Sequence, residues 1–317
     1  MLAGMLCCLL MLGCAAAETV AFQGLEVDSG IETLDMGKTR VYNWEKFYAF
    51  LDQLPNLKRV EMYSSLIEAD VFKTLSTRYP DVTFGATLHI SERHVRTDVT
   101  AFSTLLMGDE RKATYDQCAM LRWCPNLYAL DIGHNPVKNL DFLYDLPELR
   151  VLIVAICDVT DITPIGSLKH LEYLEIFHNR IEDISCLADL PYLMDLNLVK
   201  NRIADIRPVK NLKRLQMLWM HLYNQDDPTA PDAALVQELQ EALPDCQIDW
   251  ESTSTGGAWR WPVHSHYKTL NGMFHNRAYE PFEDSDPENM PEPWRTEALR
   301  RQAESSGGSA EGSGKPD

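Results

Sequence analysis

Leu193-Met-Asp-Leu-Asn-Leu-Val-Lys-Asn201-Arg-Ile-Ala-Asp-Ile-Arg-Pro-Val209 is one copy of a pattern that this chain repeats every 22 residues. The copies open at equally spaced leucines: Leu127, Leu149, Leu171, Leu193 and Leu215. A fixed period of this length is the signature of a solenoid, in which each repeat is one supersecondary unit stacked on the next. The repeat therefore decides the fold class before any other feature of the chain.

The spacing inside one copy explains how it folds. The third copy places its apolar residues at Leu171, Leu174, Ile176, Ile181, Ile184, Leu187 and Leu190. Leu174 and Ile176 alternate as in a strand with one face inward, and the later spacing predicts an extended or 3₁₀ return. Stacking the copies buries each Leu or Ile, which stabilises the fold by roughly 1.5–3 kcal/mol per side chain.

Polar residues at fixed places complete the copy. Asn135, Asn179 and Asn201 stand at position 9, where an amide can donate and accept hydrogen bonds as the chain leaves the strand. Aspartates at position 13 are expected to fix the next turn with their side chains: Asp161, Asp183 and Asp205.

This pattern is similar to the 22-residue leucine-rich repeats of bacterial internalin-type proteins, over residues 127–224. Cys157 departs from it at the Asn position, and the last copy departs at Tyr223 and at Asp227-Pro228. The resemblance implies an α/β right-handed solenoid with a parallel concave sheet and a short 3₁₀ or extended convex side. The flanks, around Arg96-Thr-Asp98 and Gly256-Gly-Ala-Trp-Arg260, resemble uncharacterised leucine-rich repeat proteins of Gram-positive bacteria, which implies no activity.

The remaining chain divides into segments of different composition. We expect these: a signal peptide at 1–17, helix-containing repeats at 22–90, a hairpin or loop excursion and a helix at 91–126, the repeats at 127–224, a capping helix and strand at 225–250, an aromatic C-terminal appendage at 251–282 and a disordered acidic tail at 283–317. The tail is predicted to be disordered because it has few apolar residues.

Two processing routes fit the apolar N-terminus. Ala15-Ala16-Ala17 suits an ordinary signal peptidase, whereas Met11-Leu12-Gly13-Cys14 resembles a bacterial lipobox, in which Cys14 is the lipidation site. No Lys or Arg precedes Lys38, so a basic n-region is missing in both cases. Either route predicts an exported protein, extracellular or lipid-anchored at the outer face of the cytoplasmic membrane.

Charge and cysteine content limit the partners. The net charge of −18, from 47 acidic and 29 basic residues, disfavours nucleic acid and unassisted docking on anionic lipid. Contact with the membrane is therefore expected only through the possible lipid anchor.

Beyond the signal segment stand Cys118, Cys124, Cys157, Cys186 and Cys246. An odd number without regular spacing indicates buried free thiols rather than a disulfide framework.

The concave face is the candidate site. Strand positions that point away from the core carry an unusual set of aromatic and charged residues, and exposed sets of this kind mark interaction surfaces. The predicted ligand-binding residues are Asp131, Ile153, Tyr173, Glu175, Phe177, Asp195, Asn197, Met217, Trp219 and His221. The alternative is that the appendage at 251–282, or the hairpin near residue 90, folds over this face.

Other candidate chemistry is weak. His264-Ser-His266 supplies two possible metal ligands but no third, so we expect a surface turn and no metal. The acidic run 280–292 lacks the form of a calcium loop. No catalytic set can be placed and no cofactor is expected. The sequence favours a non-catalytic module that binds a protein or a glycan. The alternative is an assembly subunit that docks through the aromatic appendage.

Overall fold

The computed structural model describes residues 18–105, 112–220, 233–252, 259–260 and 264–307. These fall into two compact units, one of the described residues up to 65 together with 73–86, the other of residues 66–72 and the described residues from 87 onward. Within the described residues, no helix is long and apolar enough to cross a membrane.

The first unit contains a hairpin, a helix and a parallel strand pair. Strands β1 (Thr19–Phe22) and β2 (Leu25–Asp28) pair antiparallel, and β3 (Thr33–Asp35) pairs in parallel with β4 (Arg59–Ile67). Helix α1 (Trp44–Leu51) starts at Asn43, whose side chain accepts a hydrogen bond from Lys46 N. Phe22 packs on Phe47 and Phe50 in the core of this unit.

Helices and strands alternate in residues 22–90, where helix-containing repeats were predicted. Helix α2 (Ala69–Arg78) and strand β5 (Thr83–Ile90) follow β4 along the chain. The sheet order is β3-β4-β5-β6, with β6 (Arg93–Arg96) forming the expected hairpin with β5. Its four strands belong to a sheet separate from that of the 22-residue repeats. The interpretation of residues 22–90 as helix-containing repeats stays a prediction, and the parallel register Thr33↔Arg59 is compatible with it.

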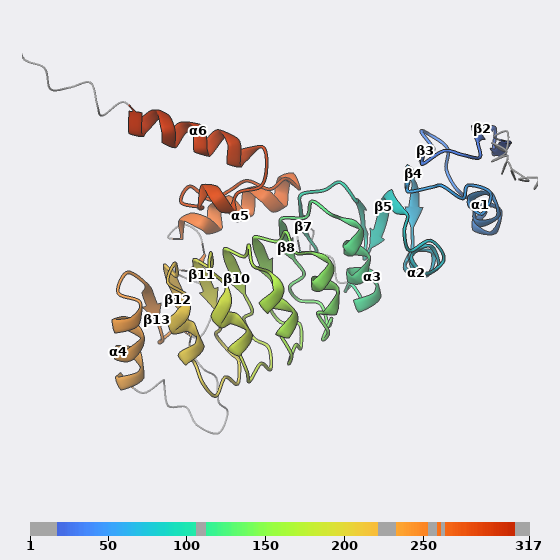
Figure 1. The fold of residues 1–317 in the computed structure, drawn as a ribbon. Coiled ribbons are helices and arrows are strands. Elements are labelled where there is room, and N and C mark those ends of the chain that lie inside the picture. The colour runs from blue at the N-terminus through green and yellow to red at the C-terminus, as the bar shows by residue number, and fades with distance from the viewer. Residues whose placement is uncertain (1–17, 106–111, 221–232, 253–258, 261–263, 308–317) are drawn as a thin grey trace, which may run out of the picture. The chain divides into compact units, whose positions relative to one another are not determined.

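The second unit is built on a seven-stranded sheet of order β13-β12-β11-β10-β9-β8-β7. The strands are β7 (Ala101–Ser103), β8 (Ala129–Asp131), β9 (Val151–Ile153), β10 (Tyr173–Glu175), β11 (Asp195–Asn197), β12 (Met217–Trp219) and β13 (Gln247–Asp249). All six pairs of neighbouring strands in this sheet are parallel. Part of the predicted loop excursion at 91–126 is thus the first strand of the sheet (Figure 1).

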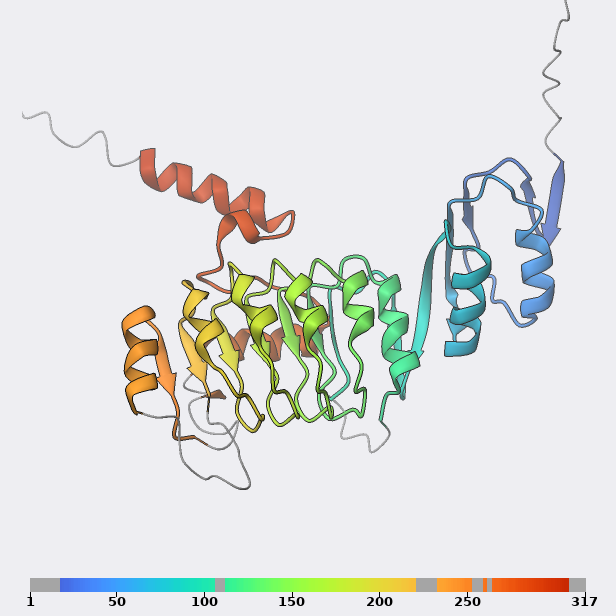
Figure 2. The same ribbon diagram turned by 60° about the horizontal axis from the view of Figure 1, so that its bottom comes forward.

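Short 3₁₀ turns carry the chain back along the convex side, as the repeat spacing predicted. They are η2 (Asp141–Asp145), η3 (Thr163–Ser167), η4 (Ser185–Asp189) and η5 (Arg207–Asn211), seen side by side in Figure 2. Helix α3 (Tyr115–Ala119) with η1 (Met120–Trp123) precedes the repeats, and α4 (Ala233–Ala242) with β13 follows them. The predicted α/β solenoid is confirmed.

The predicted roles of the polar positions are met. Asn179 Oδ1 accepts hydrogen bonds from the backbone N–H groups of Cys157 and Val159, and its Nδ2 donates to the carbonyls of Val154 and Ile176. Asp161, Asp183 and Asp205 each accept a backbone hydrogen bond at the start of the next 3₁₀ turn. Cys157, which lacks an amide, donates through Sγ to the carbonyl of Ile132, 3.2 Å away.

Cysteine behaves as predicted in the described residues. Cys118, Cys124, Cys157 and Cys246 are buried free thiols, and Cys186 is half-buried. Burial raises the pKa of the Cys118 thiol to about 12, so the nucleophilic thiolate is suppressed. These cysteines are parts of the core.

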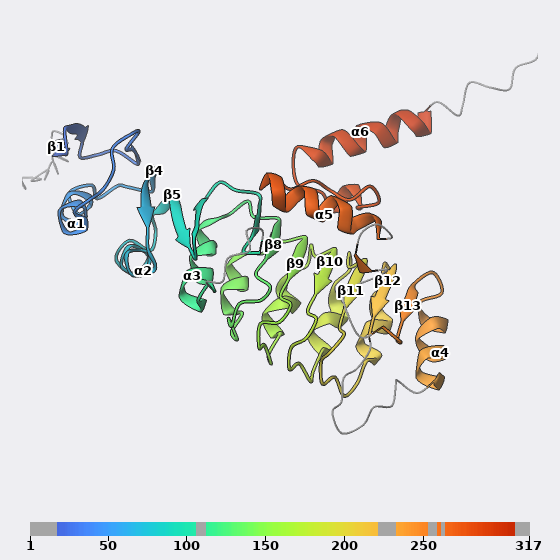
Figure 3. The same ribbon diagram turned by 180° about the vertical axis from the view of Figure 1, so that it is seen from behind.

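The C-terminal region is more ordered than its composition indicated. It holds α5 (Ser265–Asn276), then η7 (Pro287–Asn289) and α6 (Trp294–Gly307). The prediction of disorder from residue 283 is therefore wrong as far as residue 307. We call residues 259–260 and 264–307 the C-terminal cover, because α5 lies across the sheet with α6 beyond it (Figures 1 and 3).

Candidate functional site

The C-terminal cover lies on the predicted binding face. Tyr173, Glu175, Asp195, Asn197 and Trp219 each expose 1% or less of their surface. Asp131, Ile153 and Phe177 are also buried, Met217 is partly buried, and His221 lies outside the described residues. The apolar members of this set (Ile153, Tyr173, Phe177, Met217 and Trp219) share one cluster with the cover's Trp259, Leu270, Met273, Phe274, Tyr279 and Phe282. Of the two arrangements weighed from the sequence, the structure has the covered one.

Trp259 fills the centre of this face. Its ring centroid lies 5.5 Å from that of Tyr173 and 5.5 Å from that of Trp219. Its indole Nε1 donates to Glu175 Oε2 at 2.8 Å, while the neighbouring Arg260 guanidinium contacts Glu175 Oε1 at 3.0 Å. A fully buried carboxylate is costly unless it is paired and hydrogen-bonded. Glu175 is satisfied here by the cover itself.

A second buried carboxylate, Asp195, holds the two histidines of the cover. Asp195 Oδ1 lies 3.2 Å from His264 Nε2, and Oδ2 lies 2.5 Å from His266 Nδ1. On its other side, His266 Nε2 lies 2.8 Å from Asp284 Oδ1. Burial opposes protonation of His266, but its bonds to Asp195 and Asp284 outweigh this and raise its pKa to about 10. The hydrogen bond from His266 likewise lowers the pKa of Asp284 to about 2.

The expectation of a surface turn at His264-Ser-His266 is therefore wrong. His264 is 4% exposed and His266 is 6% exposed, at the start of α5. Asp195 supplies the third polar group, from a strand about 70 residues upstream in the sequence. Asp195, His264 and His266 each offer one donor atom, and these atoms lie within 4.8 Å of one another. This is the cluster among the described residues that could hold a metal ion.

A third buried carboxylate, Glu172, holds the loop between α5 and α6. Glu172 accepts from Ser285 Oγ at 2.6 Å and from Asn289 Nδ2 at 2.7 Å. The buried Arg150 guanidinium donates to the Asn289 carbonyl through Nε and Nη2, at 3.1 and 3.0 Å. Burial raises the pKa of Glu172 against these hydrogen bonds. The sequence did not single out Arg150 or Glu172, because each stands just before its strand at a position where the repeat requires no particular residue type.

The concave face has a further buried acid, Asp131, whose hydrogen bonds come from the solenoid. Asp131 accepts from Gly133 N at 2.9 Å and from Ser103 Oγ at 2.9 Å. Burial raises its pKa to about 6, which these hydrogen bonds oppose. Ser103 belongs to β7, the strand that the sequence did not reveal.

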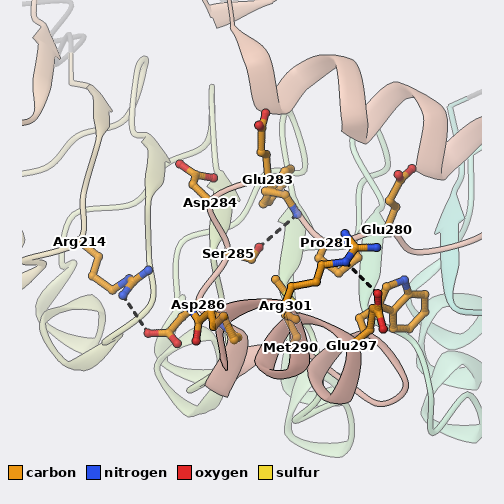
Figure 4. A pocket seen from close by; sticks show the side chains of 15 residues that line it. Arg214, Glu280, Pro281, Glu283, Asp284, Ser285, Asp286, Met290, Glu297 and Arg301 are labelled. Carbon is orange, nitrogen blue, oxygen red and sulfur yellow. Dashed lines mark hydrogen bonds and ion pairs between the residues drawn. The ribbon is translucent and has the colours of Figure 1, made fainter. Parts of the chain in front are cut away.

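The outer side of the cover is hollowed. A solvent-open groove of about 800 Å³ lies between residues 280–290 and α6 (Figure 4). Pro281, Phe282, Met290 and Trp294 provide its apolar lining. Acidic side chains surround these residues: Glu280, Glu283, Asp284, Asp286 and Glu297. Arg214 and Arg301 are its cations, and Arg214 is paired with Asp286 at 2.9 Å. The acidic run 280–292 thus forms part of a groove.

The strand register reproduces the period of the sequence repeat. From β8 to β12, every paired residue is 22 positions from its partner, as in Tyr173↔Asp195 and Asp195↔Met217. From β8 to β11, each strand leads through a corner to a 3₁₀ turn on the convex side and then to the next strand. The chain has the fold of a leucine-rich repeat solenoid. The period and pattern of its 22-residue repeats resemble those of internalin-type proteins.

No protein-family model matches this leucine-rich repeat protein, and no curated protein matches it. Similar solved structures include an internalin from Listeria monocytogenes str. 4b F2365, at 21% identity, covering 63% of this chain and 56% of that one, with a TM-score of 0.37. Internalin C2 of the same strain is 19% identical over 69% of this chain and 70% of its own, with a TM-score of 0.33. A plant peptide hormone receptor in complex with RGF2 is 16% identical over 56% of this chain and 26% of its own, with a TM-score of 0.31.

Proposed function

We propose that this leucine-rich repeat protein is a non-catalytic protein-binding module displayed outside the cytoplasmic membrane. The observation that supports this proposal is that the concave sheet already binds a segment of its own chain, the C-terminal cover. That sheet holds a polypeptide segment through an inserted Trp259 and through buried pairs from Glu175 and Asp195. Aromatic anchors in desolvated pockets and paired charges are the means by which proteins bind peptides.

The partner is expected on the outer side of the C-terminal cover, because the cover buries the residues of the concave face. The groove there combines an apolar lining with exposed Glu280 and Glu283, which have no ion-pair partner among the described residues. Trp294, half-buried, presents part of its ring to the same groove. A partner segment with Lys or Arg beside an apolar anchor complements this surface in charge and in shape.

The test is selection from a random peptide library on the folded chain. We expect binders rich in Lys and Arg around one large apolar residue. Glu280→Gln/Glu283→Gln and Trp294→Ala are each expected to weaken the selected peptides by about tenfold, which is roughly 1.4 kcal/mol. Glu26→Gln/Glu45→Gln removes two exposed carboxylates elsewhere and serves as the matched control. Binders without basic residues, or equal binding to all variants, would contradict the groove.

A second candidate keeps the partner on the concave sheet, where it would displace the cover. The aromatic and charged set at Tyr173, Glu175, Asp195 and Trp219 favours it, since these residues already bind one segment. Trp259→Ala separates the two candidates because it loosens the cover. A displacing partner would bind this variant more tightly than the wild type, whereas a partner of the groove would bind it equally or less well.

Display at the membrane surface is proposed from the N-terminal sequence alone, since residues 1–17 lie outside the described residues. Lipidation at Cys14 predicts incorporation of a palmitate analogue and fractionation with membranes. Cys14→Ala should abolish both. Secretion of an unlabelled protein that starts at Glu18 would instead support cleavage after Ala17.

A further inference from the structure

We infer that Asp195, His264 and His266 form a binding site for a divalent transition metal of the zinc class, which fastens the C-terminal cover to the concave sheet. The inference does not depend on the proposed groove or on any partner. It rests on the placement of three donor groups, the carboxylate behind one of them, and the charge of the cluster.

The donors meet from two parts of the chain that the fold brings together. Asp195 begins β11, while His264 is the N-cap of α5 and His266 lies in its first turn. The three donor atoms lie within 4.8 Å of one another, with His264 Nε2 at 3.2 Å and His266 Nδ1 at 2.5 Å from the Asp195 oxygens. Tetrahedral zinc, with ligand bonds of about 2.0–2.2 Å, requires donor atoms about 3.3–3.5 Å apart. Shifts of less than about 1 Å would reach that geometry at both Asp195 contacts.

A carboxylate stands behind one of the histidines. His266 Nε2 lies 2.8 Å from Asp284 Oδ1, on the ring edge opposite Asp195. Ligand histidines usually direct their second nitrogen to a carboxylate or carbonyl, which fixes the ring and strengthens the metal bond. In this arrangement His266 Nδ1 would bind the metal through its lone pair. Its Nε2–H group would donate a hydrogen bond to Asp284. Asp284 exposes 40% of its side chain and so marks a route from solvent.

Charge favours a divalent ion. Asp195 and Asp284 bring two negative charges to a cluster whose members Asp195, His264 and His266 are almost completely buried. One divalent ion bound by neutral imidazoles balances these two charges. Buried charges require such compensation. Two imidazoles and one carboxylate suit zinc rather than calcium or magnesium, which prefer oxygen ligands.

The test uses the tag-free full chain after removal of metal with a chelator. Zinc titration by calorimetry, with elemental analysis after desalting, should give one ion per chain. The melting temperature should rise with free zinc, because the ion binds the folded state. Replacing zinc with cobalt should give the visible absorption bands of a low-symmetry site with nitrogen and oxygen donors.

Three variants distinguish the site from surface binding. Asp195→Asn should abolish stoichiometric binding, and His178→Gln, which removes an exposed histidine at a repeat edge, should not change it. Asp284→Asn should keep one ion per chain but weaken its affinity by about 10- to 100-fold. Because Asp284 is half-exposed, this variant tests the site even if Asp195→Asn fails to fold.

A cluster held together by a protonated histidine alone would retain no zinc. Its melting temperature would then be the same with zinc and with chelator, and this result would overturn the inference. Equal zinc affinity in the wild type and in Asp284→Asn would overturn it too, since that carboxylate would then have no part in binding.

Discussion

At the scale of single residues, two buried carboxylates decide how the C-terminal cover attaches. Glu175 and Asp195 occupy equivalent faces of adjacent strands, two residues apart in the repeat register. Each is fully covered, and each is paired with a group from the cover. An ionised carboxylate in an apolar surrounding is tolerated only with such partners. These residues therefore specify which segment can lie on the sheet.

Trp259 provides the first prediction. Its ring is buried between Tyr173 and Trp219, and its indole N–H bonds Glu175. Trp259→Ala should lower the free energy of unfolding by about 3–5 kcal/mol, from lost packing and a residual cavity. Trp259→Phe keeps most of the ring and should lose less. Urea denaturation followed by far-UV circular dichroism measures both. A loss below about 1 kcal/mol for the alanine variant would mean that the cover does not depend on this residue.

Asp131 provides a prediction for pH. Burial raises its folded pKa to about 6 from the ordinary value of 3.8, so folding favours the protonated acid. The stability that this preference contributes is present below about pH 3.8 and is lost as the pH rises through 6. Asp131→Asn cannot ionise. It should therefore be more stable than the wild type at pH 8, by about 1–3 kcal/mol, with the advantage declining toward pH 4.

Urea midpoints of both proteins at pH 8 and pH 4 measure this difference. Asp116→Asn, at an exposed position of α3, is the control and should show little pH-dependent change relative to wild type. An Asp131→Asn advantage that is constant between the two pH values would show that ionisation of this acid is not responsible.

At the scale of elements, the repeat could be predicted from its leucines and the cover could not. Leu174 and Ile176 fix which side of β10 faces the core, so Tyr173 and Glu175 were placed on the correct face. What lies over that face depends on contacts between residues far apart in sequence, such as Glu175 and Trp259, 84 residues apart. No local periodicity encodes such a contact. The spacing of His264 and His266 suggested a pair of metal ligands. The third ligand, Asp195, was recognisable from the sequence only as one of several acids on the concave face.

The same reason explains the error at β7. Ala101–Ser103 has three residues, all buried, between polar segments, and lies 28 positions before its partners in β8. The 22-residue period does not reach it. A strand of three residues is recognised only in the structure, where it pairs with β8 at the edge of the sheet.

Asn179 supplies the prediction at this scale. Its side chain satisfies two backbone N–H groups and two carbonyls at the corner between β10 and the convex side. Asn179→Ala leaves these buried groups unpaired, at about 1–3 kcal/mol each where water cannot enter. We expect a loss of at least about 3 kcal/mol in urea denaturation. Asn139→Ala, at an exposed turn with local bonds to Asp141, should cost less than about 1 kcal/mol. Similar losses for the two variants would contradict a special role for the position.

At the scale of the whole molecule, the low apolar content after residue 283 was misleading. That segment does not form a core of its own. Asn289 and Ser285 instead satisfy Arg150 and Glu172 on the repeats, and Trp294 packs on Tyr128 and Tyr279. Composition predicts whether a segment can fold alone, and it fails where a segment folds on a preformed surface.

This dependence leads to the last prediction. Removal of residues 259–317 would expose Ile153, Tyr173, Phe177 and Trp219 together, and contiguous apolar surface of this kind promotes association. The repeats should remain folded, because each contacts mainly its neighbours. The shortened chain should therefore bind more of the dye ANS and elute as an oligomer in size-exclusion chromatography with light scattering. Removal of 308–317 alone is the control and should leave both measurements unchanged. A monomeric shortened chain with no added dye binding would mean that the cover does not protect this face in solution.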